Sequence, residues 1–136
     1  MREIKFRGKR KDNNEWVYGS LVTYGNQVFI WEKFTSGYIA TAEVKRLFSE
    51  TFIEVVPETV GQYTGLKDSK GVEIYGGSLI KDPQGSVGKV FYNKTQSGYL
   101  VNWHKKDGTW ETDSCIGYGI VVGDIYTNPE LLKCTE

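Results

Sequence analysis

One histidine and two cysteines are the residues with which this sequence would most readily perform acid–base or nucleophilic chemistry. They are His104, Cys115 and Cys134. If residues 99–104 and 109–116 pair as a hairpin, His104 would lie across from Cys115, as a Cys–His dyad requires. The simpler interpretation is a small cysteine that fills space in a strand. We therefore predict no catalytic residues.

The residue types and their spacing also do not indicate a metal or phosphate site. A single histidine and two cysteines outside any C-x-x-C arrangement cannot build a common zinc site. The glycines around Thr64 fit neither phosphate-loop spacing. Among the scattered carboxylates, only Glu111 and Asp113 share a strand face at i, i+2. We predict no metal and no cofactor.

Basic residues close to aromatic residues form the clearest binding signal. Small β-barrels bind single-stranded nucleic acid by stacking bases on aromatic rings beside cations. The candidate binding residues are Arg7, Lys9, Lys11, Trp16, Trp103, Lys105, Lys106 and Trp110. The alternative is that the aromatics fill the core and the lysines keep turns soluble. The charge balance favours this alternative, because 17 basic residues offset 17 acidic ones, whereas nucleic-acid-binding domains are usually basic overall.

Alternating apolar and polar residues predict strands in the first part of the chain. Residues 2–7 alternate, and residues 16–24 are rich in strand formers, which predicts a hairpin. Gly25-Asn26 predicts a second hairpin turn before residues 27–31. Residues 42–49 have a helical spacing of apolar residues, and a strand continuing to Val56 is the alternative.

The second part of the chain predicts short strands at regular spacing, separated by turns. The candidate strands are residues 78–81, 88–92, 98–103, 109–112 and 116–126. Asn128 is placed to cap a final helical turn that begins at Pro129.

These elements predict a mainly β fold with at most one or two short helices. An N-terminal β-hairpin region, residues 1–56, would precede a small SH3-like or similar β-barrel, residues 57–136. One continuous domain over residues 1–136 is the alternative.

The stretch from Pro57 to Tyr75 joins the two regions and is read as architectural. Pro57 ends a strand because it lacks an N–H. The glycines permit bends, and Asp68 accepts hydrogen bonds from the backbone that follows it. The residues singled out here are Pro57, Gly61, Gln62, Tyr63, Thr64, Gly65, Asp68, Gly71, Ile74 and Tyr75.

Three blocks of the sequence resemble the YopX family, small proteins encoded by phages and prophages of Gram-positive bacteria. They are residues 1–7 with 16–19, residues 56–75, and residues 122–132. The resemblance implies a mainly β fold, a phage origin and a cytoplasmic setting in the infected or lysogenic bacterial host. It implies no reaction, so it carries over no catalytic residue.

The chain departs from the family pattern directly after Tyr75. The family usually has an acidic residue, glycine and aspartate there, whereas this chain has Gly76-Gly77-Ser78. If the acids form a metal or polar site, this chain lacks that site. If they cap a turn, the Ser78 hydroxyl can make similar local hydrogen bonds.

We expect a non-enzymatic phage accessory protein that acts by binding a protein partner or a second copy of itself. Exposed edge strands in the N-terminal hairpin region would allow self-association, and hence a homo-oligomer, by strand addition. The alternative function is single-stranded nucleic-acid binding by the basic and aromatic residues. The sequence has no signal-type apolar region and no run that spans a bilayer, so we predict no membrane partner.

Overall fold

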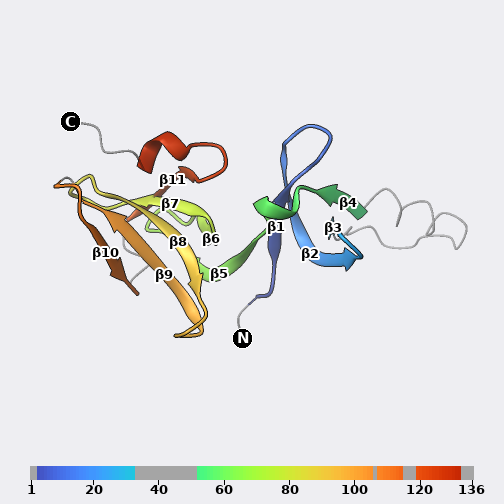
Figure 1. The fold of residues 1–136 in the computed structure, drawn as a ribbon, viewed down its shortest axis with the longest axis horizontal. Helices are drawn as coiled ribbons and strands as arrows, with labels where there is room; N and C mark the ends of the chain where they lie inside the picture. Colours follow the sequence, from blue (N-terminus) through green and yellow to red (C-terminus); the bar gives the residue numbers. More distant parts are fainter. Residues whose placement is uncertain (1–2, 33–51, 106, 115–118, 133–136) are drawn as a thin grey trace, which may run out of the picture. The chain divides into compact units, whose positions relative to one another are not determined.

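The computed structural model describes residues 3–32, 52–105, 107–114 and 119–132 (Figure 1). Strands make up 57% of this part of the chain, and no helix within it reaches seven residues. Two 3-10 helices are present there, η1 (Pro57–Thr59) and η2 (Pro129–Leu132). The mainly β prediction is confirmed. The predicted helix over residues 42–49 lies outside the described residues.

The chain divides into two compact units, one of Glu3–Gln62 and one that contains Tyr63–Glu136. The strands of the first unit are β1 (Phe6–Lys9), β2 (Trp16–Tyr24), β3 (Gln27–Trp31) and β4 (Phe52–Val55). Strand β5 (Gly61–Lys67) begins in the first unit and continues into the second. The remaining strands are β6 (Glu73–Tyr75), β7 (Ser78–Lys81), β8 (Val87–Asn93), β9 (Gly98–His104), β10 (Trp110–Asp113) and β11 (Ile120–Asp124).

Both predicted hairpins of the N-terminal unit form, but the first strand is Phe6–Lys9, later in the chain than the predicted residues 2–7. Strands β1 and β2 pair with Phe6 opposite Gly19, and β2 turns into β3 with Tyr24 opposite Gln27. The strand order is β4-β3-β2-β1, followed by the start of β5. One face of this sheet buries the core residues Val17, Ile30 and Val55, against which Phe6, Leu21, Val28, Ile53 and Val60 pack.

The outer edge of β4 is covered by the end of β1 and the residues after it. The Val56 N–H donates to the Lys9 carbonyl at 2.8 Å, and the Lys11 N–H donates to the Glu54 carbonyl at 3.1 Å. A single bridge between Arg10 and Val55 completes the contact. The exposed edge expected in the N-terminal hairpin region is therefore not found at β4.

The C-terminal unit contains an open antiparallel sheet in the order β10-β9-β8-β7-β11. The predicted barrel is wrong, because a closed barrel needs its two outermost strands to pair. Here the last strand, β11, pairs with β7, and β10 ends the other side of the sheet (Figure 1).

The core of the C-terminal unit depends on a glycine opposite a tryptophan. Trp103 is 3% exposed and packs with Ile74, Ile80, Val90 and Val101, the other residues of the core cluster. On β8, Gly88 lies directly opposite Trp103. A Cβ atom on Gly88 would lie 2.5 Å from Val101 Cγ2 and 2.9 Å from Trp103 Cε3. The missing side chain makes room for the indole ring.

Not all of the glycines in the stretch from Pro57 to Tyr75 make turns. As predicted, β4 ends before Pro57, and Gly71 occupies a turn with φ +86°. Gly65 instead lies within β5, at φ +91°, where the pairing with β6 shifts register. Gly61 is also in β5, opposite Arg7. Gly65 therefore lies at a register shift inside a strand and Gly61 lies in a paired strand, so neither residue makes a turn.

We predict that Gly88→Ala lowers the free energy of unfolding by about 1–3 kcal/mol, because the added methyl group overpacks the core beside Trp103. Urea denaturation at neutral pH measures this change. Gly98→Ala is the matched control at the other end of the same hairpin, since the nearest atom to its Cβ would be 3.8 Å away. Equal losses in the two variants would contradict the role given to Gly88.

Candidate functional site

Strands β1 and β2 bring Arg7, Lys9 and Trp16 onto one face of the N-terminal sheet, because Lys9 lies directly opposite Trp16. The Arg7 guanidinium carbon is 4.2 Å from the centre of the Trp16 ring, and Lys9 Nζ is 5.4 Å from it. These are cation–π distances. Arg7 is only 8% exposed, so most of this cation is withdrawn from solvent.

Lys11, the third basic residue predicted here, is paired with a carboxylate. Lys11 Nζ lies 3.1 Å from Glu54 Oε2 on β4. The hydrogen bond from Lys11, and to a smaller extent that from Gln27, lowers the pKa of the partly exposed Glu54 carboxyl below its ordinary value. Lys11 thus contributes to covering the edge of β4 as well as carrying a charge.

The predicted binding residues of the C-terminal unit, Trp103, Lys105, Lys106 and Trp110, include a core residue and a surface stack. Trp103 is buried, and Lys105 Nζ lies 5.9 Å from the centre of its ring. Trp110 is 50% exposed and stacks on His104, with ring centres 4.3 Å apart and an interplanar angle of 7°. Lys106 lies outside the described residues. The alternative in which aromatics fill the core therefore describes Trp103, and nucleic-acid binding by the others stays a prediction.

His104 is held in place by its surroundings. Its Nδ1 atom contacts the Leu132 carbonyl oxygen, which accepts hydrogen bonds but cannot donate them. Nδ1 therefore carries the proton, and the ring joins β9 to η2. Cys115 and Cys134 lie outside the described residues, so the Cys–His dyad is not tested.

Two further features of the described residues bear on the kind of site. No group of three or more His, Cys, Asp or Glu side chains within them is arranged to hold a metal ion. None of the helices they form has the length and apolar character needed to cross a membrane.

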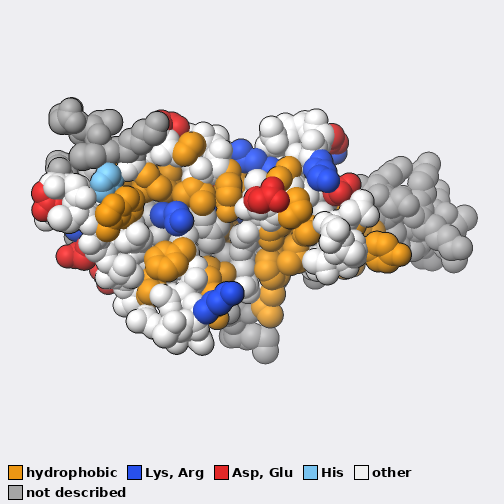
Figure 2. Space-filling model, in the orientation of Figure 1, with side chains coloured by type: hydrophobic (Ala, Val, Ile, Leu, Met, Phe, Trp, Pro, Cys, Tyr) orange, Lys and Arg blue, Asp and Glu red, His pale blue; other side chains and the backbone are white. Residues whose placement is uncertain are grey.

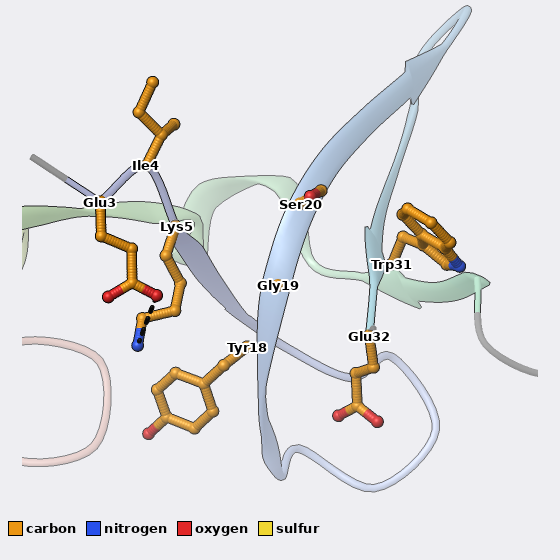
Figure 3. A pocket seen from close by; sticks show the side chains of 8 residues that line it. All are labelled: Glu3, Ile4, Lys5, Tyr18, Gly19, Ser20, Trp31 and Glu32. Atoms are coloured by element: carbon orange, nitrogen blue, oxygen red, sulfur yellow. Dashed lines mark ion pairs between the residues drawn. The ribbon is translucent and has the colours of Figure 1, made fainter. Parts of the chain in front are cut away.

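A pocket of about 490 Å³ lies on the N-terminal unit (Figure 3). Lys5 Nζ is 3.6 Å from Glu3 Oε2, and these two side chains lie on the same side of β2 as Tyr18, whereas Glu32 lies on the other side. The remaining lining residues are Ile4, Gly19, Ser20 and Trp31. The pocket is lined by both charge signs and offers no set of groups that defines one chemistry.

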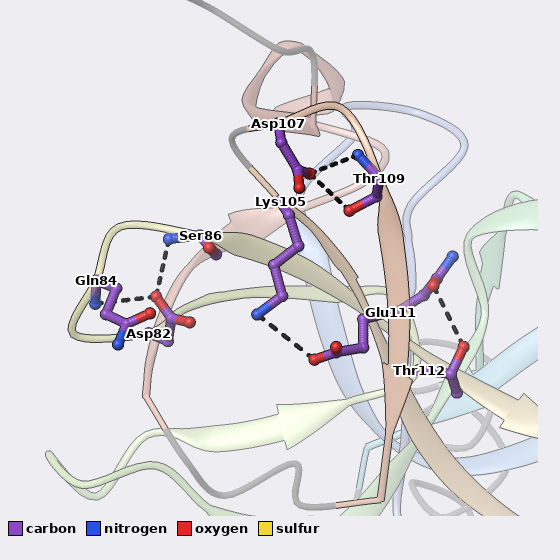
Figure 4. A network of polar contacts seen from close by, with 9 residues as sticks. Asp82, Gln84, Ser86, Lys105, Asp107, Thr109, Glu111 and Thr112 are labelled. Carbon is purple, nitrogen blue, oxygen red and sulfur yellow. Dashed lines mark hydrogen bonds and ion pairs between the residues drawn. The ribbon is translucent and has the colours of Figure 1, made fainter.

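Strand β10 is the exposed end of the C-terminal sheet. All four of its residues, Trp110–Asp113, are exposed, and among the described strands it pairs with β9 alone. Figure 4 shows Glu111 and Thr112 projecting to opposite sides of the strand. Lys105 Nζ lies 3.6 Å from Glu111 Oε1. Glu111 and Asp113 share a face, as their i, i+2 spacing predicts.

The register of β10 shows which of its backbone groups point outward. The Lys105 N–H donates to the Thr109 carbonyl, so this pair is a hydrogen-bonded pair of the ladder. Antiparallel pairs alternate between hydrogen-bonded and non-hydrogen-bonded types. The bonded pairs on β10 are therefore Glu111 and Asp113. The N–H and C=O groups of Trp110 and Thr112 point away from β9, toward the open edge.

Asp68 covers the corresponding edge at the other end of this sheet. Its Oδ1 accepts hydrogen bonds from the N–H groups of Lys70 and Val72, both at 2.8 Å, and closes the turn as predicted. Its Oδ2 accepts from the N–H of Val121 on β11, also at 2.8 Å. This long-range bond was not predicted, because nothing in the local sequence around Asp68 points to a partner 53 residues away.

Asp68 is buried, with 7% of the residue exposed. Burial alone would raise its pKa, but the backbone hydrogen bonds from Val121, Val72 and Lys70 favour the ionised form and bring the pKa below its ordinary value. The carboxylate is therefore a charged, structural group at neutral pH.

A protein-family model with the description YopX protein matches residues 5–133 of the chain. The chain belongs to the YopX family. The match covers nearly the whole chain, which confirms the resemblance carried by the three sequence blocks. A comparison with curated proteins finds no match.

In this YopX-family chain, Ser78 has the turn-capping role that its position allows. The Ser78 hydroxyl oxygen accepts a hydrogen bond from the Tyr75 N–H at 2.9 Å, and Ser78 is fully buried. Gly77, at φ +94°, packs against the ring of Tyr126. The serine thus performs in this chain the local bonding that a turn-capping acid would perform.

We predict that Asp68→Asn lowers the free energy of unfolding by about 1–3 kcal/mol at pH 7, because an amide cannot accept all three backbone hydrogen bonds as a carboxylate does. The lowered pKa of Asp68 gives stability that is present above the ordinary value of 3.8 and is lost as the pH falls through the folded-state value. The gap between wild type and variant should therefore narrow below about pH 4.

Urea denaturation at pH 7 and pH 3 measures both gaps. Asp107→Asn is the matched control, because Asp107 also caps a turn, through Thr109, but is fully exposed. If the free energy of unfolding of Asp68→Asn differed from that of the wild type by the same amount at both pH values, the stabilising role of the ionised carboxylate would be contradicted.

Proposed function

We propose that this protein acts by binding, and that an extended protein segment adds to β10 as a further strand. The observation that carries the proposal is the open edge of β10, where the outward N–H and C=O groups of Trp110 and Thr112 border solvent-exposed side chains. Such an edge is a template for strand addition.

The other sheet edges in the described part of the chain are less suited to an added strand. The outer edge of β4 is bonded to residues 9–11, and Val121 on β11 is bonded to Asp68. Strand β6 is three residues long, and two of them, Ile74 and Tyr75, are buried. The contrast supports β10 as the binding edge.

We propose no catalytic role for the described acidic residues in the turns. Asp82 Oδ1 accepts from the N–H groups of Gln84 and Ser86. Asp124 Oδ1 accepts from those of Tyr126 and Thr127. These carboxylates stabilise turns, as the Asp68 carboxylate does. An acid–base mechanism would instead need a carboxylate that can reach a substrate.

The setting of the protein is proposed from its family. We take it to be a phage or prophage accessory protein that works in the cytoplasm of an infected or lysogenic bacterium. Its partner at β10 is a protein chain, either a different protein or a second copy.

Single-stranded nucleic acid is the less favoured ligand. Lys11 and Lys105 are each within ion-pair distance of a carboxylate, and Figure 2 shows basic side chains set among acidic and hydrophobic ones on the visible face. A site for a phosphate backbone would instead gather cations in a groove.

We predict that Thr112→Pro abolishes capture of the partner while the fold is retained. Proline removes an N–H that faces the open edge, a position where edge strands tolerate it. The measurement is affinity capture from lysate of a bacterium that carries the phage or prophage, with and without nuclease treatment, and with wild type and variant as paired baits. Capture that persists with Thr112→Pro would contradict the binding edge, and capture by wild type that disappears after nuclease treatment would support nucleic acid instead.

Glu111→Pro is the control for the register of β10. Its N–H faces β9, so proline there should break a ladder bond and lower the free energy of unfolding more than Thr112→Pro does. Urea denaturation of the two variants measures the difference. The reverse order would show that the outward-facing residues have been assigned wrongly.

A further inference from the structure

The charges of β10 discriminate between the two kinds of protein partner. Resting on the proposed strand addition, we infer that the added strand belongs to a different protein and carries Lys or Arg at alternate positions, with apolar residues between them. A second copy of this chain is not the occupant.

The acidic face of β10 sets the charge of the partner. Glu111 and Asp113 share that face and lie directly opposite Trp103 and Val101 of β9. On an added strand, the residues opposite them would have Cβ atoms about 4.5–5.5 Å away, a distance at which opposite charges stabilise pairing and like charges oppose it. Two such residues on the partner are separated by one residue. Basic side chains at alternate positions therefore complement this face.

A second copy would bring acidic side chains to the same positions. An antiparallel pair of β10 strands that uses the outward groups of Trp110 and Thr112 can place Trp110 opposite Thr112 of the second copy. Glu111 then faces Glu111 of that copy. In the register shifted by two residues toward Asp113, Glu111 faces Asp113 of the copy. In the register shifted the other way, Glu111 faces Thr109 and Asp113 comes level with Asp107 of the copy. Each register brings carboxylates level with carboxylates, which destabilises the pairing.

The other face of β10 sets the residues between the cations. Trp110 is half exposed there, stacked on His104. A pocket of about 360 Å³ borders the far end of the strand. It is lined by Gln96, Leu100, Thr112, Asp113 and Ser114, of which Leu100 is buried. An apolar side chain on the partner would pack against the Trp110 ring, and a second would enter the pocket.

Lys105 does not reverse the negative charge of the face that carries Glu111 and Asp113. Its ammonium lies 3.6 Å from Glu111 and 5.9 Å from the Trp103 ring, so it is placed beside the core face at the turn end of β10. An ion pair with a largely exposed carboxylate is weak and exchanges readily. An incoming cation can therefore share or replace it.

The test uses three blocked, fluorescently labelled nonapeptides in which valine alternates with lysine, glutamine or glutamate. Fluorescence anisotropy titrations at low salt measure their affinities for the wild-type chain. The lysine peptide should bind about threefold to tenfold more tightly than the glutamine peptide, and the glutamate peptide should bind most weakly. The preference should decrease as salt is added, because exposed charges are screened.

A charge-neutral double variant, Glu111→Gln with Asp113→Asn, is the matched control. It should bind the lysine and glutamine peptides equally while keeping the wild-type urea denaturation midpoint to within a small shift. Equal binding of all three peptides to wild type, or a lysine preference that survives in the double variant, would overturn the inference.

Thr112→Pro separates this inference from the proposed function. If peptide binding and partner capture are unaffected by the proline, strand addition at β10 is itself wrong. If the proline abolishes peptide binding and partner capture, but the three peptides bind the wild type equally, strand addition at β10 is supported and the preference for a cationic partner is wrong. Sedimentation equilibrium completes the test: the masses of wild type and Thr112→Pro should agree, and a loss of dimer in the proline variant would identify a second copy as the occupant.

Discussion

Backbone groups at the edge of an open sheet must be paired, covered or left to solvent, and this constraint organises the structure. At β4 the covering comes from Lys9 and Lys11, which exchange backbone hydrogen bonds with the outer side of the strand. At β11 it comes from the Asp68 carboxylate, bound to Val121. Strand β10 is exposed along all four residues. The difference between covered and exposed edges is what gives the chain a candidate binding surface.

The covering groups are supplied by turns whose residues serve two purposes. Asp68 closes its own turn through Lys70 and Val72 and also accepts a hydrogen bond from Val121 on β11. The stability of this local turn is therefore coupled to an outermost strand of the C-terminal sheet. A buried carboxylate is costly unless it is fully hydrogen-bonded, and three backbone donors meet that need. The conformation of the family-like stretch is therefore determined by the sheet it borders as well as by its own glycines.

Sequence patterns predicted most strands and turns because these depend on neighbouring residues. Alternation and the Gly25-Asn26 turn signal predicted the two N-terminal hairpins, and the i, i+2 spacing of Glu111 and Asp113 placed both on one face of β10. The same patterns missed whatever depends on distant pairing. They could not show that β11 pairs with β7 and leaves the sheet open, that Gly88 makes room for Trp103, or that Gly65 lies in a bulge. The open edge of β10 follows from strand order, which alternation does not encode.

A short, charged edge strand is also a known means of preventing sheets from joining edge to edge. Strand β10 has both properties, with four residues and two carboxylates. This protective role is compatible with the proposed binding, because charges that would oppose a second copy would also select a strand of opposite charge. The half-exposed Trp110 on the other face adds apolar contact that protection alone would not require. Under the proposed strand addition, the two faces together would favour a partner of opposite charge over a second copy, which is how specificity between strands is usually obtained.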